Sequence, residues 1–140
     1  MRIVLDTDAV TSAFISPDGA SRQLLLGALD GKFSLLLSTS LLLEYESVLR
    51  RPEHLARAQA TDAEVMEILD ALAGICVPVV FDYGWRPTGA HADDELVVET
   101  AINGHADVLV TFNLRDMRSA AASFGFEALR PGPLLRRMRK

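Results

Sequence analysis

Cysteine, lysine and long apolar runs are scarce in this sequence. The single cysteine, Cys76, cannot form an internal disulfide, which excludes the disulfide-stapled secreted classes and favours a reducing compartment. The apolar stretch from Leu35 to Leu43 is interrupted by Ser38 and falls well short of the roughly 20 residues that span a bilayer. The chain also reaches Asp6 before the apolar core of a signal peptide could develop. We therefore expect a cytoplasmic protein without a membrane span.

An excess of positive charge is missing as well. The 14 Lys and Arg residues against 19 Asp and Glu residues give a formal net charge of −5, which excludes binding of nucleic acid through bulk positive charge. Apolar residues are plentiful: 49% of the 140 residues are hydrophobic, and the mean hydropathy is +0.19. This material is enough to close one core, so we expect a single domain over residues 1–140.

Short apolar runs alternate along the chain with longer stretches of helical periodicity. The predicted strands are Arg2–Leu5, Phe33–Leu37, Val77–Phe81, Val108–Thr111 and Phe126–Leu129. The predicted helices are Ser21–Leu29, Leu41–Arg50, Pro52–Gln59, Asp62–Ile75, Asp93–Asn103 and Leu114–Phe124. Strands that read as continuous apolar runs are typical of parallel sheets covered on both faces. The expected fold is a three-layer α/β/α sandwich with a mainly parallel central sheet of about five strands.

Three local features refine this expectation. Asp82 to Ala92 mixes aromatic, proline and glycine residues and predicts an extended loop inserted within the domain. Thr61 and Glu64 form a potential capping box, which predicts that a helix begins at Asp62. The last residues, 136–140, form a small basic tail that we expect to be solvated.

Acidic side chains follow the strands at the edge where a parallel sheet carries its chemistry. Ligands of open α/β sheets bind beyond the carboxyl ends of the strands, where loops and helix starts converge. Each acidic region alone is also explained by helix capping, because Asp and Asn are preferred caps and acids in a first turn complement the helix dipole. The four regions are Asp6 with Asp8, Glu44, Asp93 to Glu95, and Asn113 with Asp116.

Glu44 is harder to explain as a surface residue. Its helical neighbours Leu41 and Val48 are apolar, so its carboxylate lies beside apolar positions. Glu46 has a similar setting, but Arg50 lies four residues later and can pair with it. Periodicity alone leaves open which of the two glutamates faces a site.

Carboxylates gathered from four regions imply a cation. Together they would repel one another and raise one another's pKa, and a hard divalent ion would relieve that repulsion. Oxygen ligands suit Mg²⁺ or Mn²⁺, whereas His54, His91 and His105 lack the spacing of a zinc site. The chain also has no Gly-rich phosphate loop and no nucleophile elbow.

Four motifs in one order give the sequence a family resemblance. They are LDTD at Leu5–Asp8, LLLEYESVL at Leu41–Leu49, ADDELVVETA at Ala92–Ala101 and VTFNLRDM at Val110–Met117. This set resembles the PIN-domain ribonucleases over nearly the whole chain, and most of all the bacterial branch of toxins from toxin-antitoxin systems. The resemblance implies a PIN-like fold in which the catalytic and metal-binding acids are Asp6, Glu44, Asp94 and Asp116, and Glu46 lies on the outer face.

The implied activity is hydrolysis of RNA phosphodiester bonds with Mg²⁺ or Mn²⁺, which would orient and deprotonate water. The implied partners are an RNA substrate, a cognate antitoxin that covers the acidic site, and a second copy in a homodimer. The residues expected to position the acids, the water or the substrate are Thr7, Asp8, Asp93, Thr111, Asn113 and Arg115.

Two departures from the family pattern sustain an alternative. The first motif usually ends in Asn but ends in Asp8 here, and many relatives carry Asp where this chain has Asn113. A catalytically impaired PIN-fold interaction module would show such changes. A Mg²⁺-dependent phosphate-handling or receiver-like protein is a further alternative. A receiver, however, needs a lysine after a late strand, and the only lysines are Lys32 and Lys140.

Overall fold

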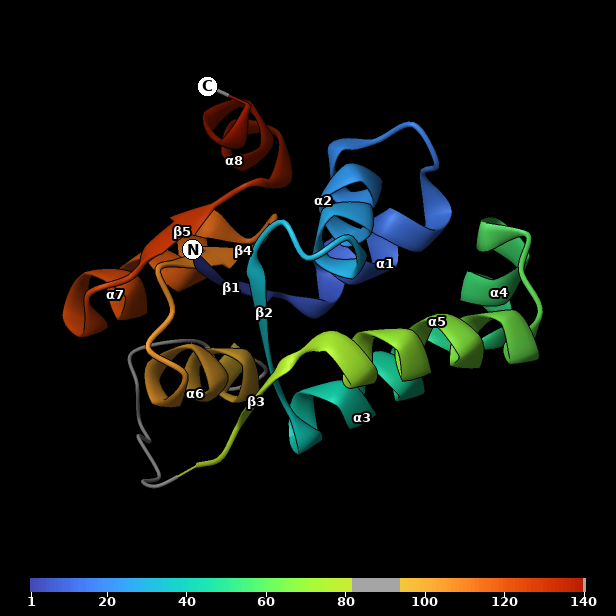
Figure 1. The fold of residues 1–140 in the computed structure, drawn as a ribbon, viewed down its shortest axis with the longest axis horizontal. Helices are drawn as coiled ribbons and strands as arrows, with labels where there is room; N and C mark the ends of the chain where they lie inside the picture. The colour runs from blue at the N-terminus through green and yellow to red at the C-terminus, as the bar shows by residue number, and fades with distance from the viewer. Residues whose placement is uncertain (82–93, 140) are drawn as a thin grey trace.

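The computed structural model describes residues 1–81 and 94–139, which form a five-stranded sheet with helices on both faces (Figure 1). All strand pairs are parallel, and the strand order is β3-β2-β1-β4-β5. The predicted α/β/α sandwich is therefore confirmed. The strands are β1 (Arg2–Leu5), β2 (Ser34–Ser38), β3 (Val77–Val79), β4 (Val108–Val110) and β5 (Glu127–Leu129).

Eight helices connect and follow these strands in the described residues. They are α1 (Thr7–Ile15), α2 (Ala20–Leu29), α3 (Thr39–Leu49), α4 (Pro52–Ala58), α5 (Asp62–Ile75), α6 (Glu95–Asn103), α7 (Leu114–Phe124) and α8 (Pro131–Met138). In Figure 1, α2 and α8 lie above the sheet and α6 lies below it, where it packs against β1, β2 and β4. None of the described helices combines the length and the apolar character needed to cross a membrane.

The centre of the sheet determines where a site can form. Strands β1 and β4 pair with Leu5 opposite Val110, so the two strands end at the same level. Both strands are buried, because every residue from Ile3 to Leu5 and from Val108 to Val110 belongs to the core. From β1 the chain moves to β2 on one side, and β4 returns on the other side, so the strand order reverses between β1 and β4. Crevices at such reversals are the usual ligand sites of open α/β sheets.

Most predicted helices agree with the observed ones, and α5 and α7 have the predicted bounds. The capping box of α5 is present, with Thr61 and Glu64 exchanging hydrogen bonds. Helix α1 was not predicted. Arg136, Arg137 and Arg139 of the basic tail are exposed, as expected. Helix α8 over residues 131–138 was not predicted; it buries Leu134 and packs against α2. The predicted loop at 82–92, together with Asp93 and His91, lies outside the described residues.

Candidate functional site at the carboxyl edge of the sheet

Asp6 lies at the reversal point, directly after β1. It is the N-cap of α1, and its Oδ1 accepts a hydrogen bond from the Thr7 backbone N–H at 2.8 Å. Its Oδ2 accepts one from the Thr111 hydroxyl, also at 2.8 Å, directly after β4. The side chain is only 7% exposed. Burial, and next the negative charge of Asp8, raise the pKa of Asp6 to about 7.

Asp8 stands in the first turn of α1 and extends the site toward the end of β4. Its Oδ2 accepts a hydrogen bond from the Phe112 backbone N–H at 3.1 Å and lies 3.5 Å from the Thr111 hydroxyl. Burial raises the pKa of Asp8 as well. Its Oδ1 is buried and has no hydrogen-bond partner in the part of the chain that the structure describes. A buried carboxylate oxygen without a donor is costly unless a ligand or ion meets it.

Helix α3 brings Glu44 to the same place. Glu44 Oε2 accepts a hydrogen bond from the Thr7 hydroxyl, so a single residue of α1 contacts both Glu44 and Asp6. The next residue, Tyr45, is fully buried and donates its hydroxyl hydrogen bond to the backbone carbonyl of Leu5. Tyr45 therefore ties α3 to the last residue of β1. Sequence reasoning did not identify this tyrosine, because its partner is a backbone atom 40 residues away.

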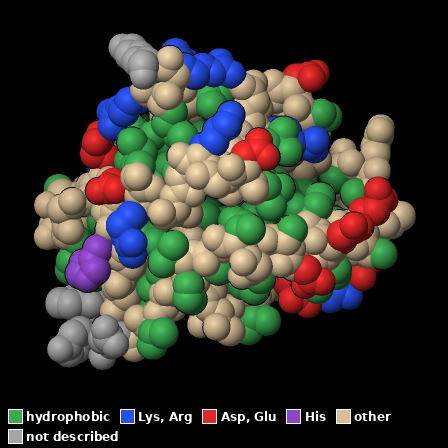
Figure 2. All heavy atoms as spheres, viewed as in Figure 1, with side chains coloured by type: hydrophobic (Ala, Val, Ile, Leu, Met, Phe, Trp, Pro, Cys, Tyr) green, Lys and Arg blue, Asp and Glu red, His purple; other side chains and the backbone are tan. Residues whose placement is uncertain are grey.

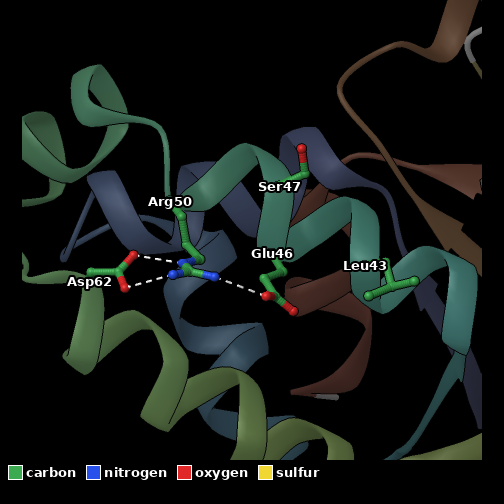
Figure 3. Close-up of a pocket in the computed structure, with 5 residues that line it drawn as sticks. All are labelled: Leu43, Glu46, Ser47, Arg50 and Asp62. Carbon is green, nitrogen blue, oxygen red and sulfur yellow. Dashed lines mark hydrogen bonds and ion pairs between the residues drawn. The ribbon is translucent and has the colours of Figure 1, made fainter.

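Glu46, two residues further on, belongs to a different surface. Its carboxylate pairs with Arg50 at 3.0 Å, and Arg50 also pairs with Asp62 at 2.6 Å (Figure 3). These residues line a shallow hollow of about 360 Å³ between α3 and α5, together with Leu43 and Ser47. The question that periodicity left open is thereby answered: Glu44 faces the edge of the sheet, and Glu46 lies in an arginine-paired group outside it.

Asn113 joins two acids from the next helices. Asp94 is the N-cap of α6, and Asp116 lies in the first turn of α7. The Asn113 side-chain Nδ2 donates to Asp116 Oδ2 at 2.9 Å and lies 3.4 Å from Asp94 Oδ2. Asn113 is the N-cap of α7, but its side chain makes no cap hydrogen bond and contacts the carboxylates instead.

All five acids are thus connected through three neutral residues. The Thr111 hydroxyl, which donates to Asp6, also accepts a hydrogen bond from the Asn113 backbone N–H at 2.9 Å. A continuous chain of hydrogen bonds therefore runs from Glu44 across to Asp116. We call this set the acid network: Asp6, Asp8, Glu44, Asp94 and Asp116 with Thr7, Thr111 and Asn113. Arg115 is exposed beside it, and Asp93 lies outside the described residues.

The PIN domain family matches residues 2–115. This chain belongs to the PIN-domain family. The match confirms the resemblance that the four motifs carry, and it spans the acid network from Asp6 up to the residue before Asp116.

A solved structure shares the fold of this PIN domain. It is a chain of the crystal structure of VapBC2 from Rickettsia felis bound to a DNA fragment from their promoter. The two chains superpose with a TM-score of 0.59 over 93% of this chain and 98% of that chain, at 15% sequence identity. At this low sequence identity the similarity shows a shared fold only. No curated protein sequence gives a significant match.

The donor set of this PIN domain fits a hard divalent cation. Every acid of the network offers carboxylate oxygens, which Mg²⁺ and Mn²⁺ prefer, and no described residue donates a hydrogen bond to Asp8 Oδ1. Within residues 1–81 and 94–139, no Lys or Arg hydrogen-bonds to Asp6, Asp8, Glu44 or Asp116. In the same residues no three acidic, His or Cys side chains converge on one metal position. The Thr111 hydroxyl and the Asn113 amide lie between pairs of carboxylates instead.

Proposed function

We propose that this PIN domain is a Mg²⁺- or Mn²⁺-dependent endoribonuclease and the toxin of a toxin-antitoxin pair. The observation that carries the proposal is the acid network, in which side chains from α1, α3, α6 and α7 meet at the reversal of strand order. Family membership supports a nuclease activity, and the fold shared with a chain of VapBC2 supports the assignment to a toxin-antitoxin pair.

Neutral residues give the site its chemical properties. The Thr7 and Thr111 hydroxyls and the Asn113 amide hold the carboxylates in place without neutralising them. A bound divalent ion would activate water and stabilise the negative charge that develops on the phosphoryl oxygens. Asp6, Glu44, Asp94 and Asp116 are the residues that would hold it, with Asp8 beside them. Because burial raises the pKa of Asp6, a cation at this carboxylate would compete with a proton.

A receiver-like protein fits the structure less well. Such a protein needs a lysine at the edge of the sheet that carries its acids. Lys32 precedes β2 and thus lies at the amino edge, opposite to Asp6. The other lysine, Lys140, lies outside the described residues. A catalytically impaired interaction module has one specific observation in its favour, which is that the Asn113 amide occupies the place between Asp94 and Asp116.

A nuclease assay with matched glutamate variants tests the proposal. The purified protein, free of any partner, is incubated with single-stranded and structured RNA in Mg²⁺, Mn²⁺ or EDTA. We expect cleavage with either metal, none in EDTA, and loss of cleavage in Glu44→Gln and Asp6→Asn. Glu46→Gln removes a carboxylate from the same helix outside the acid network, so it should cleave like the unmodified protein. Cleavage that persists in EDTA or in Glu44→Gln would reject the mechanism.

Metal binding is measured separately from cleavage. Titration with Mn²⁺, followed by its electron paramagnetic resonance signal, should give saturable binding to the unmodified protein and to Glu46→Gln. Binding should weaken by at least tenfold in Glu44→Gln. Saturable binding without RNA cleavage would favour the impaired module, and metal-stimulated release of phosphate from small esters alone would favour a phosphate-handling enzyme.

The partners implied by the family resemblance stay within the proposal. An antitoxin that covers the acid network should abolish both cleavage and Mn²⁺ binding when it is co-purified with this chain. Light scattering of the isolated chain distinguishes a homodimer from a monomer. Antitoxin binding that leaves the Mn²⁺ signal unchanged would contradict coverage of the site.

A further inference from the structure

Phe112 is an aromatic side chain that the hydrophobic core does not use. All six phenylalanines of the chain lie in the described residues, and only Phe112 is exposed, at 44%. An exposed ring at this position is not explained by packing. The other five are buried or half-buried: Phe14, Phe33, Phe81, Phe124 and Phe126.

The backbone fixes Phe112 at the acid network. The residue lies between Thr111 and Asn113, whose side chains hydrogen-bond to the carboxylates. Its own backbone N–H donates to Asp8 Oδ2 at 3.1 Å. The exposed ring is therefore carried by the short segment that joins the end of β4 to the start of α7, within one residue of two members of the acid network.

Two exposed arginines, Arg115 and Arg130, lie close to this ring along the chain and across the sheet. Arg115 follows Phe112 by three residues in α7. Arg130 follows Leu129, the carbonyl of which accepts a hydrogen bond from the Thr111 backbone N–H at 2.9 Å. Both arginines are exposed, and neither has a hydrogen bond or ion pair to any residue that the structure describes. Their charge is thus free to meet an anion from solution.

Basic residues are also concentrated in the C-terminal part of the sequence, which contains Arg115 and Arg130. Half of the 14 Lys and Arg residues but only two of the 19 acids lie after Leu114, in the part that forms α7, β5 and α8. Figure 2 shows basic side chains gathered around the C-terminal helix at the top and acidic ones over α4 and α5 at the right. Of these basic residues, Arg115 and Arg130 follow the carboxyl ends of β4 and β5, at the edge of the sheet that carries the acid network.

We propose that Phe112 is a stacking platform for one unpaired base of a single-stranded RNA, with Arg115 and Arg130 contacting the phosphates on either side. This inference rests on the proposed ribonuclease function and names the residues that would bind its RNA beside the acid network. Aromatic rings bind bases through their π-faces, and a base must be unpaired and unstacked to reach such a ring. Stacking on Phe112 would hold the neighbouring phosphate at the acid network, whose own negative charge repels it.

The proposal is tested by binding to a short labelled RNA in the Glu44→Gln background with Mg²⁺, where the substrate is preserved. Fluorescence anisotropy should show that Phe112→Ala raises Kd by about tenfold or more, and that Phe112→Trp restores it. Leu43→Ala, which truncates a side chain 58% exposed on α3, should leave Kd unchanged. Equal Kd values for Phe112→Ala and Phe112→Trp would overturn the proposal. Thermal unfolding of each variant serves as the check on folding.

RNAs with a single abasic site locate the stacked base. With Phe112 present, one abasic position should weaken binding by about tenfold, and the same RNA should lose nothing further in Phe112→Ala. A fully paired duplex should bind more weakly and be insensitive to Phe112. Equal sensitivity to Phe112 in the duplex, or additive losses at every abasic position, would contradict stacking of one base.

The two arginines are tested by salt dependence. Arg115→Ala and Arg130→Ala should each reduce the slope of log K against log salt by about 0.7, as expected for one phosphate contact of a single strand. Arg57→Ala, an exposed arginine of α4, is the matched control and should leave the slope unchanged. The two proposals fail differently. If Phe112→Ala cleaves RNA as fast as the unmodified protein, only the stacking proposal is contradicted. If the unmodified protein binds RNA through Phe112 but does not cleave it, only the nuclease proposal is contradicted.

Discussion

Asp6→Asn should stabilise the metal-free protein at alkaline pH. The substitution replaces a buried carboxylate by an isosteric neutral amide. Asn remains a good N-cap, so its Oδ1 can keep the hydrogen bond from the Thr7 backbone N–H. Its Nδ2 can donate to the Thr111 hydroxyl, which then donates to Asp8. The change therefore removes the negative charge and preserves the hydrogen bonds of the site.

The magnitude follows from the raised pKa of Asp6. That pKa rises from 3.8 to about 7 on folding. Between these two pH values the folded state binds more protons than the unfolded state. The contribution of Asp6 to the free energy of unfolding is therefore fully present below pH 3.8 and is lost as the pH rises through about 7. A shift of this size corresponds to about 4 kcal/mol, since one pKa unit is about 1.4 kcal/mol. About 3 kcal/mol of this should be lost between pH 5 and pH 8.

Urea unfolding in EDTA at several pH values measures the effect. The unmodified protein should lose stability toward pH 8 relative to Asp6→Asn, and at pH 8 the variant should be the more stable one. The matching difference in Tm at pH 8 is about 10 °C. Asp70→Asn, in an exposed position of α5, is the control for a change of net charge and should follow the unmodified protein. Parallel pH profiles for Asp6→Asn and the unmodified protein would refute the reasoning.

Addition of metal narrows the difference in stability between the two proteins. At pH 8, Mg²⁺ at 100 times its Kd should stabilise the unmodified protein by about 2.7 kcal/mol, because a ligand that binds only the folded state shifts the unfolding equilibrium. Asp6→Asn has lost a carboxylate from the acid network and should gain much less. Equal stabilisation of both proteins by Mg²⁺ would place the ion away from Asp6.

Three further substitutions probe the residues around the acids. Thr7→Val removes the hydroxyl that holds Glu44 and should weaken Mn²⁺ binding by about tenfold while Tm changes little, as calorimetric titration and melting would show. Asn113→Asp replaces a bridging amide by a sixth carboxylate in the acid network, so urea unfolding in EDTA should show a loss of about 1–3 kcal/mol and Mn²⁺ binding should tighten. Tyr45→Phe leaves the Leu5 carbonyl without its donor and should cost about 1–3 kcal/mol in the same unfolding assay.

The sheet was predictable because its strands are buried on both faces. The runs at Arg2–Leu5 and Val108–Thr111 are continuous and apolar, as expected for central parallel strands, and both are observed to within one residue. The edge strand β3 is shorter than predicted, since pairing ends at Val79 and Val80 is exposed. The bounds of the central strands were thus predicted more accurately than those of the edge strand. An edge strand has a neighbour on one side only, so its length depends on where that single pairing ends.

The two missed helices lack the usual signals. Helix α1 begins directly after β1. Asp6 is the single residue between the two elements and is the N-cap of the helix, so no turn residues mark the boundary. Helix α8 begins with Pro131, Gly132 and Pro133, a composition typical of loops. Proline is nevertheless compatible with a first helical turn, where its missing N–H has no partner to lose. Burial of Leu134 against the rest of the fold then decides in favour of a helix.

The acids could be located from sequence, but their hydrogen bonds could not. Carboxyl ends of neighbouring parallel strands meet at one edge, which is why Asp6 and the Asn113–Asp116 region were expected at the same edge. Whether the Asn113 amide caps a helix or bridges two acids depends on the position of α6, which carries Asp94. That position is set by long-range packing and cannot be predicted from periodicity. The choice between Glu44 and Glu46 was likewise made by partners distant in sequence, Thr7 in one case and Asp62 beyond Arg50 in the other.

Helix α3 carries two glutamates whose different partners argue for different roles. Glu46 is half-exposed and paired with an arginine, an arrangement that satisfies its charge and contributes little to stability. Glu44 is held by a hydroxyl, and the neighbouring Asp6 is also held by neutral donors while burial raises its pKa. A carboxylate group kept for structure alone would be more stable with arginines than with hydroxyls. Retaining net negative charge in a buried place makes physical sense where a cation completes the site.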